Sequence, residues 1–312
     1  MRNSEMRRFA LKVLTFGGLM GLLYLGLGLW MYHVEKIWYY GGLNLAPGDT
    51  LIGIGDSRSV QNLNPAMISG LKNMSLTGSQ VAVWEKRLRD IVEANRIDGV
   101  SRSFIVEAIP EMQVEGKPHV RDWERDRAFL WLLDERLRKS VEFDNLLLEF
   151  FRTEFPSRFC VWLNTVIRGS KLRSGFCGGF SAPAARGGYT RKEREQEHSK
   201  WILGLGDKWS CKNRLQKFEQ MLPTIQSVGG RMIVVTFPIY GVDSTNEHFA
   251  AFQREVSDWC RQRDIPYLDF SGLRLGDEYW LDAVHLNRRG AEIIWRECAK
   301  KLASSEGLRG FE

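Results

Sequence analysis

The order of apolar and polar positions divides the chain into an apolar start and a longer part of mixed pattern. No charged residue lies between Val13 and Tyr32, and at about 1.5 Å per residue this run is long enough to span a hydrocarbon core of roughly 30 Å. After a linker at 33–49, short apolar runs alternate with stretches of helical spacing, which indicates strands alternating with helices. The expected strands are Thr50–Gly55, Asn73–Leu76, Ser103–Ile109, Arg231–Pro238 and Pro266–Phe270, and the expected helices are Pro65–Leu71, Val81–Ala94, Glu247–Arg263 and Arg289–Leu302.

This alternation predicts the fold class of the segment 50–312. Strands that alternate with helices form a mostly parallel sheet covered on both faces, so we expect a three-layer α/β/α domain with a five-stranded sheet. The stretch at about 112–211 breaks the rhythm, because apolar residues at helical spacing are followed there by a glycine-rich run from Gly169 to Gly188. We interpret this stretch as a helical insertion with a flexible loop.

The charges around the apolar run predict how the chain crosses a membrane. Basic residues precede the run and an aromatic belt follows it, so the positive-inside rule places 1–12 in the cytoplasm, 13–32 in the membrane and everything after about Val34 outside. We therefore expect a single-pass anchor in the cytoplasmic (inner) membrane and a domain in the periplasm or another extracytoplasmic space. A cleaved signal peptide is the alternative, although its apolar region is typically only about 7–15 residues long.

Charge and cysteine usage narrow the classes of function. The net charge of +6 is modest for 312 residues, and basic and acidic residues are interspersed, so the chain shows no stripe for binding nucleic acid. The five cysteines are widely spaced without a Cys-x-x-Cys pair, and neither a P-loop nor a His-Glu-x-x-His motif occurs. We therefore expect no metal and no cofactor. Cys160 and Cys177 are either bridged in an oxidising compartment or buried as free thiols.

A candidate nucleophile follows the first expected strand. The segment 53–58 reads Gly-Ile-Gly-Asp-Ser-Arg, which begins like a dinucleotide fingerprint, but Arg58 stands at the third glycine position. The segment is not a Gly-x-Ser-x-Gly nucleophile elbow either, because Ser59 takes the place of the second glycine. Ligands bind at the carboxyl ends of the strands in open parallel sheets, so Ser57 is expected at that edge.

His285 is the histidine best placed to activate this serine. A serine hydroxyl is a poor nucleophile until a base takes its proton, and of the five histidines His285 is the one expected in a loop after a strand. Asp282 lies three residues before it and can orient the imidazole and stabilise its protonated form. An Asp-x-x-His pair alone is weak evidence, because such pairs arise often by chance.

The two motifs together resemble the first and last sequence blocks of SGNH (GDSL-like) hydrolases, whose domain is a flavodoxin-like α/β fold. Gly-Asp-Ser follows the first expected strand, and Asp-x-x-His comes just before the last expected helix. This resemblance implies that Ser57 is the nucleophile, His285 the base and Asp282 the acid that orients it. It also implies an oxyanion hole formed by the backbone N–H groups of Ser57 and of Gly78, which follows the second expected strand.

Two departures from the family pattern refine this expectation. Arg58 replaces the usual leucine, and 107–111 (Glu-Ala-Ile-Pro-Glu) replaces the Gly-x-Asn-Asp block, whose asparagine completes the oxyanion hole. A Gly-Asp-Ser-Arg block without Gly-x-Asn-Asp, behind a single anchor, is similar to the SGNH-like proteins that work with membrane-bound O-acyltransferases on cell-envelope polymers. Alginate O-acetylation and lipoteichoic acid D-alanylation are systems of this kind.

This second resemblance implies an esterase or acyltransferase that moves an acyl group to or from a hydroxyl of an envelope polysaccharide. Its substrate would be an envelope glycan or an acylated molecule, and its partner a membrane-bound O-acyltransferase. A non-catalytic scaffold for such a transferase is the alternative, because the asparagine is missing, and a carbohydrate-binding module without chemistry is a third reading. Arg58 either contacts an anionic substrate or is held in a salt bridge, and the pattern leaves both open.

Overall fold

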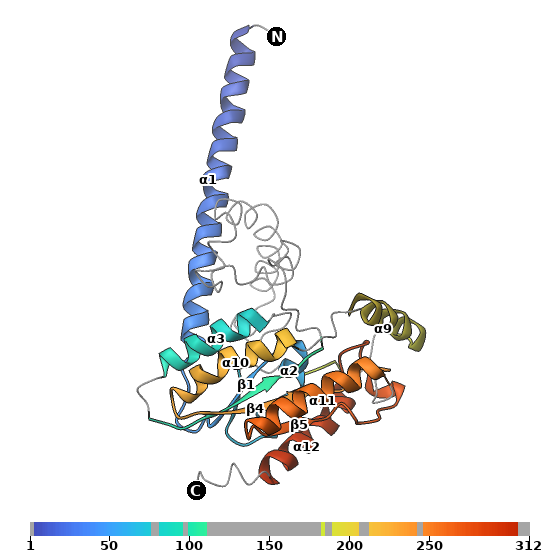
Figure 1. Cartoon of the computed structure of the whole chain (residues 1–312). Helices are drawn as coiled ribbons and strands as arrows, with labels where there is room; N and C mark the ends of the chain where they lie inside the picture. The colour runs from blue at the N-terminus through green and yellow to red at the C-terminus, as the bar shows by residue number, and fades with distance from the viewer. Residues whose placement is uncertain are drawn as a thin grey trace. The chain divides into compact units, whose positions relative to one another are not determined.

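The computed structural model describes residues 3–75, 81–95, 99–110, 182–184, 189–205, 212–241 and 246–304. These residues form two units, the helix α1 (Asn3–Gly42) and an α/β domain that begins at Leu43 (Figure 1). The elements of the domain are, in chain order, β1 (Leu51–Ile54), α2 (Ser57–Asn62), β2 (Leu71–Asn73), α3 (Val81–Ala94), β3 (Ser103–Glu107), α9 (Arg191–Leu205), α10 (Lys212–Gln226), β4 (Arg231–Thr236), α11 (Glu247–Gln262), β5 (Tyr267–Asp269), the short 3-10 helix η4 (Asp277–Tyr279) and α12 (Arg288–Ser304).

The domain is built on one sheet of five strands in the order β2-β1-β3-β4-β5, and each neighbouring pair is parallel. This confirms the α/β fold with a parallel five-stranded sheet that the alternation of elements predicts. All residues of β1 and β3 are buried, as is typical of strands that are covered on both faces. The register pairs Gly53 with Asn73 on one side and with Ile105 on the other, so β2, β1 and β3 end at a common edge.

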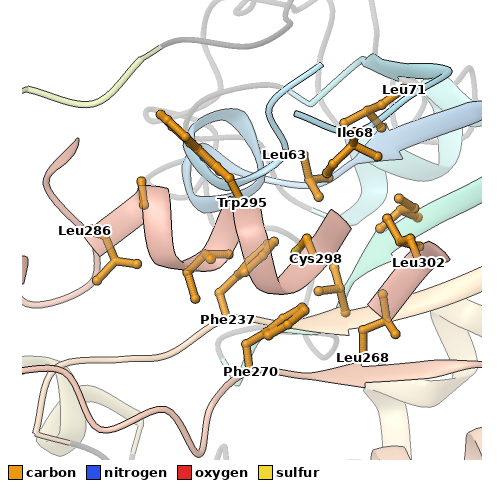
Figure 2. Close-up of a cluster of buried hydrophobic side chains, with 14 of the residues drawn as sticks. Leu63, Ile68, Leu71, Phe237, Leu268, Phe270, Leu286, Trp295, Cys298 and Leu302 are labelled. Carbon is orange, nitrogen blue, oxygen red and sulfur yellow. The ribbon is translucent and has the colours of Figure 1, made fainter. Parts of the chain in front are cut away.

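Helices cover both faces of this sheet. On one face α12 packs against alternate strand positions, among them Ile105, Ile233 and Leu268, and Figure 2 shows part of this cluster. The intervening strand positions point to the opposite face, because successive side chains of a strand alternate. On that face α10 contacts both α3 and β4 (Figure 1). It also contacts α11, because the rings of Phe218 and Trp259 lie 5.4 Å apart between centroids.

Two local predictions are wrong in the segment between β1 and α3. The sequence predicts a short helix at Pro65–Leu71, but the chain turns there and then enters β2, which covers Leu71–Asn73 rather than Asn73–Leu76. The side chain of Asn64 accepts a hydrogen bond from the backbone N–H of Ala66 at 3.0 Å, and this local bond favours a turn over a helix. The short helix of this segment is α2, directly after β1.

The remaining helices agree with the sequence pattern except in one place. α3 covers the predicted Val81–Ala94, and α11 and α12 lie close to their predicted ranges. α10 was not predicted, although its buried residues Phe218, Met221 and Ile225 recur at helical spacing. The predicted insertion at about 112–211 lies mostly outside the described residues, and α9 is the helix described near its end.

The helix α1 contains the predicted membrane span. Within the residues that the structure describes, Glu5–Trp30 is the one helical segment long and apolar enough to cross a membrane, with a mean hydropathy of 1.7. Its large apolar side chains are exposed, for example Leu14 at 73% and Leu22 at 68%. An apolar surface of this kind fits a helix surrounded by lipid. A signal sequence near the N-terminus can meet the same criteria of length and hydropathy, so retention and orientation stay predictions.

Candidate active site

The turn between β1 and α2 places Ser57 at the carboxyl edge of the sheet. Ser57 is the first residue of α2, and Asp56 caps this helix by accepting a hydrogen bond of 2.8 Å from a backbone N–H of its first turn. Gly55 precedes the cap, and a Cβ at this position would overlap Ser59 Oγ and the carboxylate of Glu107. Glycine is therefore required for the close approach of these two groups to the turn.

α2 is also tied to neighbouring elements by two buried groups. Nδ2 of Asn73, at the end of β2, donates to the carbonyl oxygens of Ser59 at 2.9 Å and Leu63 at 2.8 Å. These bonds satisfy carbonyl groups at the end of a six-residue helix. The indole N–H of Trp295 in α12 donates to the carbonyl of Gln61 at 2.9 Å. The helix that carries the serine is thus fixed to β2 and to α12.

The loop between β5 and α12 places the histidine and the aspartate. An isolated antiparallel bridge pairs Trp280 with Leu286, and the backbone N–H of Leu281 donates to the carbonyl of His285 at 2.9 Å. Trp280 and Leu286 are 3% and 1% exposed, so the core anchors both ends of this narrow loop. Asn287 then caps α12 by accepting N–H bonds of 3.0 and 3.2 Å from its first turn.

Ser57, His285 and Asp282 form a chain of hydrogen bonds. Ser57 Oγ lies 2.6 Å from Nε2 of His285, and Nδ1 of His285 lies 2.8 Å from Oδ2 of Asp282. An ionised carboxylate can only accept hydrogen bonds, so Nδ1 carries a proton and Nε2 is the acceptor for the serine hydroxyl. This arrangement can take the serine proton during attack on a carbonyl carbon. The fold brings the serine and the histidine together although 228 positions separate them in sequence.

The surroundings of Asp282 keep it ionised. Its Oδ1 accepts backbone N–H bonds from Val284 at 2.9 Å and from His285 at 2.7 Å. Burial by itself would raise the pKa of Asp282, but its hydrogen bonds and the charge of His285 together bring this pKa below the usual value. The carboxylate is therefore charged at neutral pH, as the partner of an imidazolium must be.

The two other predicted site residues have different outcomes. Gly78 lies outside the described residues, so its predicted role in an oxyanion hole stays a prediction. Arg58 is only 3% exposed, and its guanidinium lies 3.0 Å from Oδ2 of Asp56 and 3.1 Å from Oε1 of Glu107. The salt-bridged alternative is therefore the one that the structure shows. Contact with an anionic substrate would require Arg58 to leave the partly buried Asp56 and the fully buried Glu107, which is costly.

Glu107 is a buried residue of the site that the sequence analysis did not single out. It was noted only as part of 107–111, which replaces the Gly-x-Asn-Asp block. It ends β3 with 0% exposure, and its Oε2 accepts hydrogen bonds from Ser59 Oγ at 2.6 Å and from the Asp56 N–H at 3.1 Å. Burial and the nearby Asp56 carboxylate raise the pKa of Glu107 well above its usual range, while Arg58 and Ser59 oppose that shift. Burial also acts to raise the pKa of Asp56, but Arg58 brings it below its usual value.

A clamp around Ala283 supports the loop of the aspartate and the histidine. The N–H of Ala283 donates to Oε2 of Glu197 in α9 at 3.1 Å, and its carbonyl accepts from the N–H of Tyr240 at 3.1 Å. The Arg194 guanidinium lies 5.3 Å from the centroid of the Tyr240 ring, and the hydroxyl of that tyrosine donates to Asp277 at 3.1 Å. Sequence reasoning missed this clamp, because no motif connects α9 with the loop.

Among the described residues, neither a cysteine nor a group of metal ligands belongs to the candidate site. Within the described ranges, no group of three or more His, Cys, Asp or Glu side chains is arranged to hold a metal ion. Cys260 and Cys298 are free and buried, and burial raises the pKa of both thiols, that of Cys260 to about 12. Such thiols are unreactive at neutral pH. Cys160, Cys177 and Cys211 lie outside the described residues.

Comparisons with known proteins give little beyond this geometry. No protein-family model matches the chain, and no curated protein matches it either. Solved structures do match, and one of them is the crystal structure of a presumed acylhydrolase from Bacteroides fragilis at 2.00 Å resolution. It is 12% identical, covers 88% of this chain and 97% of its own, and has a TM-score of 0.42. At that identity and score the similarity says nothing about the activity of this chain.

Proposed function

We propose that the chain is a membrane-anchored serine esterase or O-acyltransferase of the SGNH type, which acts outside the cytoplasm on a cell-envelope polysaccharide. The observation that carries this proposal is the hydrogen-bonded chain from Ser57 through His285 to Asp282. It lies at the carboxyl edge of a parallel sheet, where open α/β domains bind their ligands. A serine bonded to a histidine that a carboxylate orients is the arrangement that activates a hydroxyl for acyl transfer.

The proposed reaction has two displacement steps. Ser57 Oγ attacks the carbonyl carbon of an ester donor while Nε2 of His285 takes the hydroxyl proton, and Asp282 stabilises the imidazolium. The bond between the carbonyl carbon and the leaving oxygen then breaks, and that oxygen receives the proton from His285. A second hydroxyl, from a sugar or from water, attacks the acyl-serine and gives its proton to His285. Release of the new ester or acid returns the proton to Ser57.

The proposed site has fewer groups to stabilise the oxyanion than the site of a fast hydrolase has. The backbone N–H groups of Ser57 and Gly78 are the proposed donors, and the asparagine of the Gly-x-Asn-Asp block has no counterpart in 107–111. Loss of one such donor costs about 10²–10³ in rate. We therefore expect slow hydrolysis of simple esters. This expectation supports a role in transfer beside a membrane-bound O-acyltransferase, which would supply the acyl group.

The missing asparagine also favours the alternative of a non-catalytic scaffold for such a transferase. The two functions differ in whether the Ser57 hydroxyl is needed. Because the three residues would act as a unit, Ser57→Ala and His285→Ala should each abolish acyl transfer to nearly the same extent, and the double variant should lose little more. Asp282→Asn should lose as much or less.

The experiment complements a deletion strain with each full-length variant and measures the ester-linked acyl groups on its envelope polymers. Ser227→Ala is the matched control, because Ser227 is exposed and lies just before β4, at the opposite end of the strands from the site. Immunoblots of the membrane fraction verify equal abundance. If Ser57→Ala restores full acylation at normal abundance, the enzymatic proposal is wrong and the scaffold takes its place.

A further inference from the structure

One buried carboxylate is bonded to the turn on both sides of Ser57. Oε2 of Glu107 accepts from the N–H of Asp56 at 3.1 Å and from Ser59 Oγ at 2.6 Å, and its Oε1 lies 3.1 Å from Nε of Arg58. One of these partners precedes Ser57 in sequence, and the other two follow it directly. Glu107 therefore links the end of β3 to the whole turn that presents the proposed nucleophile.

We infer that Glu107 is a positioning residue for Ser57, which fixes this turn so that Ser57 Oγ stays within hydrogen-bond distance of Nε2 of His285. That distance is 2.6 Å in the structure. The inference rests on the proposed function, since Ser57 must be the nucleophile for its position to matter. Glu107 acts through the turn and does not touch the reacting atoms.

Burying the Glu107 carboxylate costs desolvation free energy. This cost suggests that the side chain has a role in the site besides filling the core. Buried carboxylates carry a large desolvation penalty, and apolar side chains of similar volume often stabilise a core as well or better. The three residues directly before Glu107 in β3, Phe104, Ile105 and Val106, are apolar and buried, so an apolar side chain would continue the strand. What the carboxylate adds is two directional hydrogen bonds to the turn and an ion pair with Arg58.

The residues around the carboxylate are fitted to it. Gly55 leaves the space that Glu107 and Ser59 Oγ occupy. The hydroxyl of Ser59 donates a hydrogen bond to Glu107 in the core. Ser57 is therefore the serine of this turn that is proposed as the nucleophile. Asn73 of β2 holds the other end of α2 through two carbonyl groups. Buried polar side chains from β2 and β3, the two neighbours of β1, therefore fix α2 at both ends.

The experiment measures hydrolysis of p-nitrophenyl acetate and labelling by a fluorophosphonate probe, with the full-length protein in detergent. Glu107→Gln keeps the shape and one acceptor oxygen but replaces the other carboxyl oxygen with an amide NH₂ group, which can only donate hydrogen bonds. Ser59→Ala removes a single bond to the carboxylate. Ile105→Val, in the same strand, is the matched control for a change that loosens the core without touching the turn. Ser57→Ala identifies the labelled residue.

A displaced turn should slow the chemistry more than it weakens binding, since a shift of about 1 Å can cost about 100-fold in rate. We expect Glu107→Gln to lower kcat and the labelling rate at least about tenfold with KM within about twofold. Ser59→Ala should lower kcat less, and the double variant should match Glu107→Gln, because Ser59 acts through the same carboxylate. Ile105→Val should lower the melting temperature and leave kcat per folded molecule unchanged.

The inference is wrong if Glu107→Gln keeps the wild-type kcat per folded molecule. If Glu107→Gln does not fold, the same result in Ser59→Ala makes the inference wrong. It is equally wrong if the loss in Glu107→Gln only follows the loss of folded protein, as in Ile105→Val. A different result would overturn the proposed function itself. That result is hydrolysis and labelling at the wild-type rate in Ser57→Ala. The two failures are therefore distinguishable.

Discussion

The two oxygens of the Asp282 carboxylate have different partners. Oδ2 lies 2.8 Å from Nδ1 of His285 and orients the imidazole, whereas Oδ1 accepts the backbone N–H groups of Val284 and His285. Bonds from an aspartate to N–H groups two and three residues later are local, so the loop can form them without help from distant elements. An Asp-x-x-His sequence in this loop therefore fixes both the loop and the ring that it presents.

This local bonding predicts how stability depends on pH. The pKa of Asp282 is lowered in the folded state, so its contribution is present above the ordinary value of 3.8 and is lost as the pH falls through the folded-state value. Asp282→Asn should lower the free energy of unfolding by about 1–2 kcal/mol at pH 7, the size expected for hydrogen bonds to a charged group. Below about pH 4 the difference should shrink. Urea unfolding of both proteins from pH 3 to pH 7 measures it, and a gap that stays constant with pH contradicts the assignment.

At the scale of single residues, the sequence predicts those whose chemical type and motif indicate a catalytic role. Gly-Asp-Ser after a strand and Asp-x-x-His before a helix, through their joint resemblance to SGNH hydrolases, led to Ser57, Asp282 and His285, and the structure brings these three together. Glu107 and the ion pairs of Arg58 were not predictable in the same way. Glu107 lies 51 and 48 positions from its partners Asp56 and Ser59, so these bonds, and the ion pair of Glu107 with Arg58, can be predicted only from knowledge that β1 and β3 are neighbours.

α9 is the element that the fold class does not account for. It lies near the end of the predicted insertion, and the Glu197 carboxylate of this helix accepts the N–H of Ala283, between Asp282 and His285. A helix from the predicted insertion therefore supports the loop that carries the proposed base, His285. Removal of this bond should let the loop shift, although none of the three proposed catalytic residues is itself substituted.

Substitution of Glu197 tests this support. Losing one hydrogen bond of ordinary strength changes an equilibrium by about 0.5–1.5 kcal/mol, so Glu197→Ala should lower kcat for p-nitrophenyl acetate by about three- to tenfold. Glu195→Ala is the matched control, because Glu195 lies on the same helix, is 53% exposed and pairs with Arg191. Activity should be unchanged in that variant. Equal activity in the two variants would show that α9 does not support the loop.

Element boundaries show where the sequence pattern stops being sufficient. The long amphipathic helices α3, α11 and α12 were predictable because their apolar residues recur over several turns. β2 and α2 are too short for a periodic signal, and bonds from Asn64, Asn73 and Asp56 decide where they begin and end. The bonds of Asn64 and Asp56 are local, each with an N–H group two residues later, whereas Asn73 bonds to carbonyl groups 14 and 10 positions away. Nothing in the periodic pattern shows that these polar side chains make such bonds.

At the scale of the whole molecule, the chain combines an exposed apolar helix with a domain that buries its own core. The large apolar side chains of Glu5–Trp30 are exposed, whereas the domain buries its apolar residues between sheet and helices. A lipid environment would remove the apolar surface of α1 from water and leave the domain in solvent.

The basic residues before the span predict the orientation, because positive charge is retained on the cytoplasmic side. Alkaline phosphatase fused after Glu312 should be active, and a green fluorescent protein fused at the same position should be dark. The matched control begins at Leu43 and lacks α1, so it should reverse both results. An uncleaved anchor should also keep the fusion at full length in the membrane after carbonate extraction, whereas a cleaved signal peptide would release a shorter, soluble protein. Fluorescence from the full-length fusion would contradict the orientation, and with it a site that acts on the cell envelope.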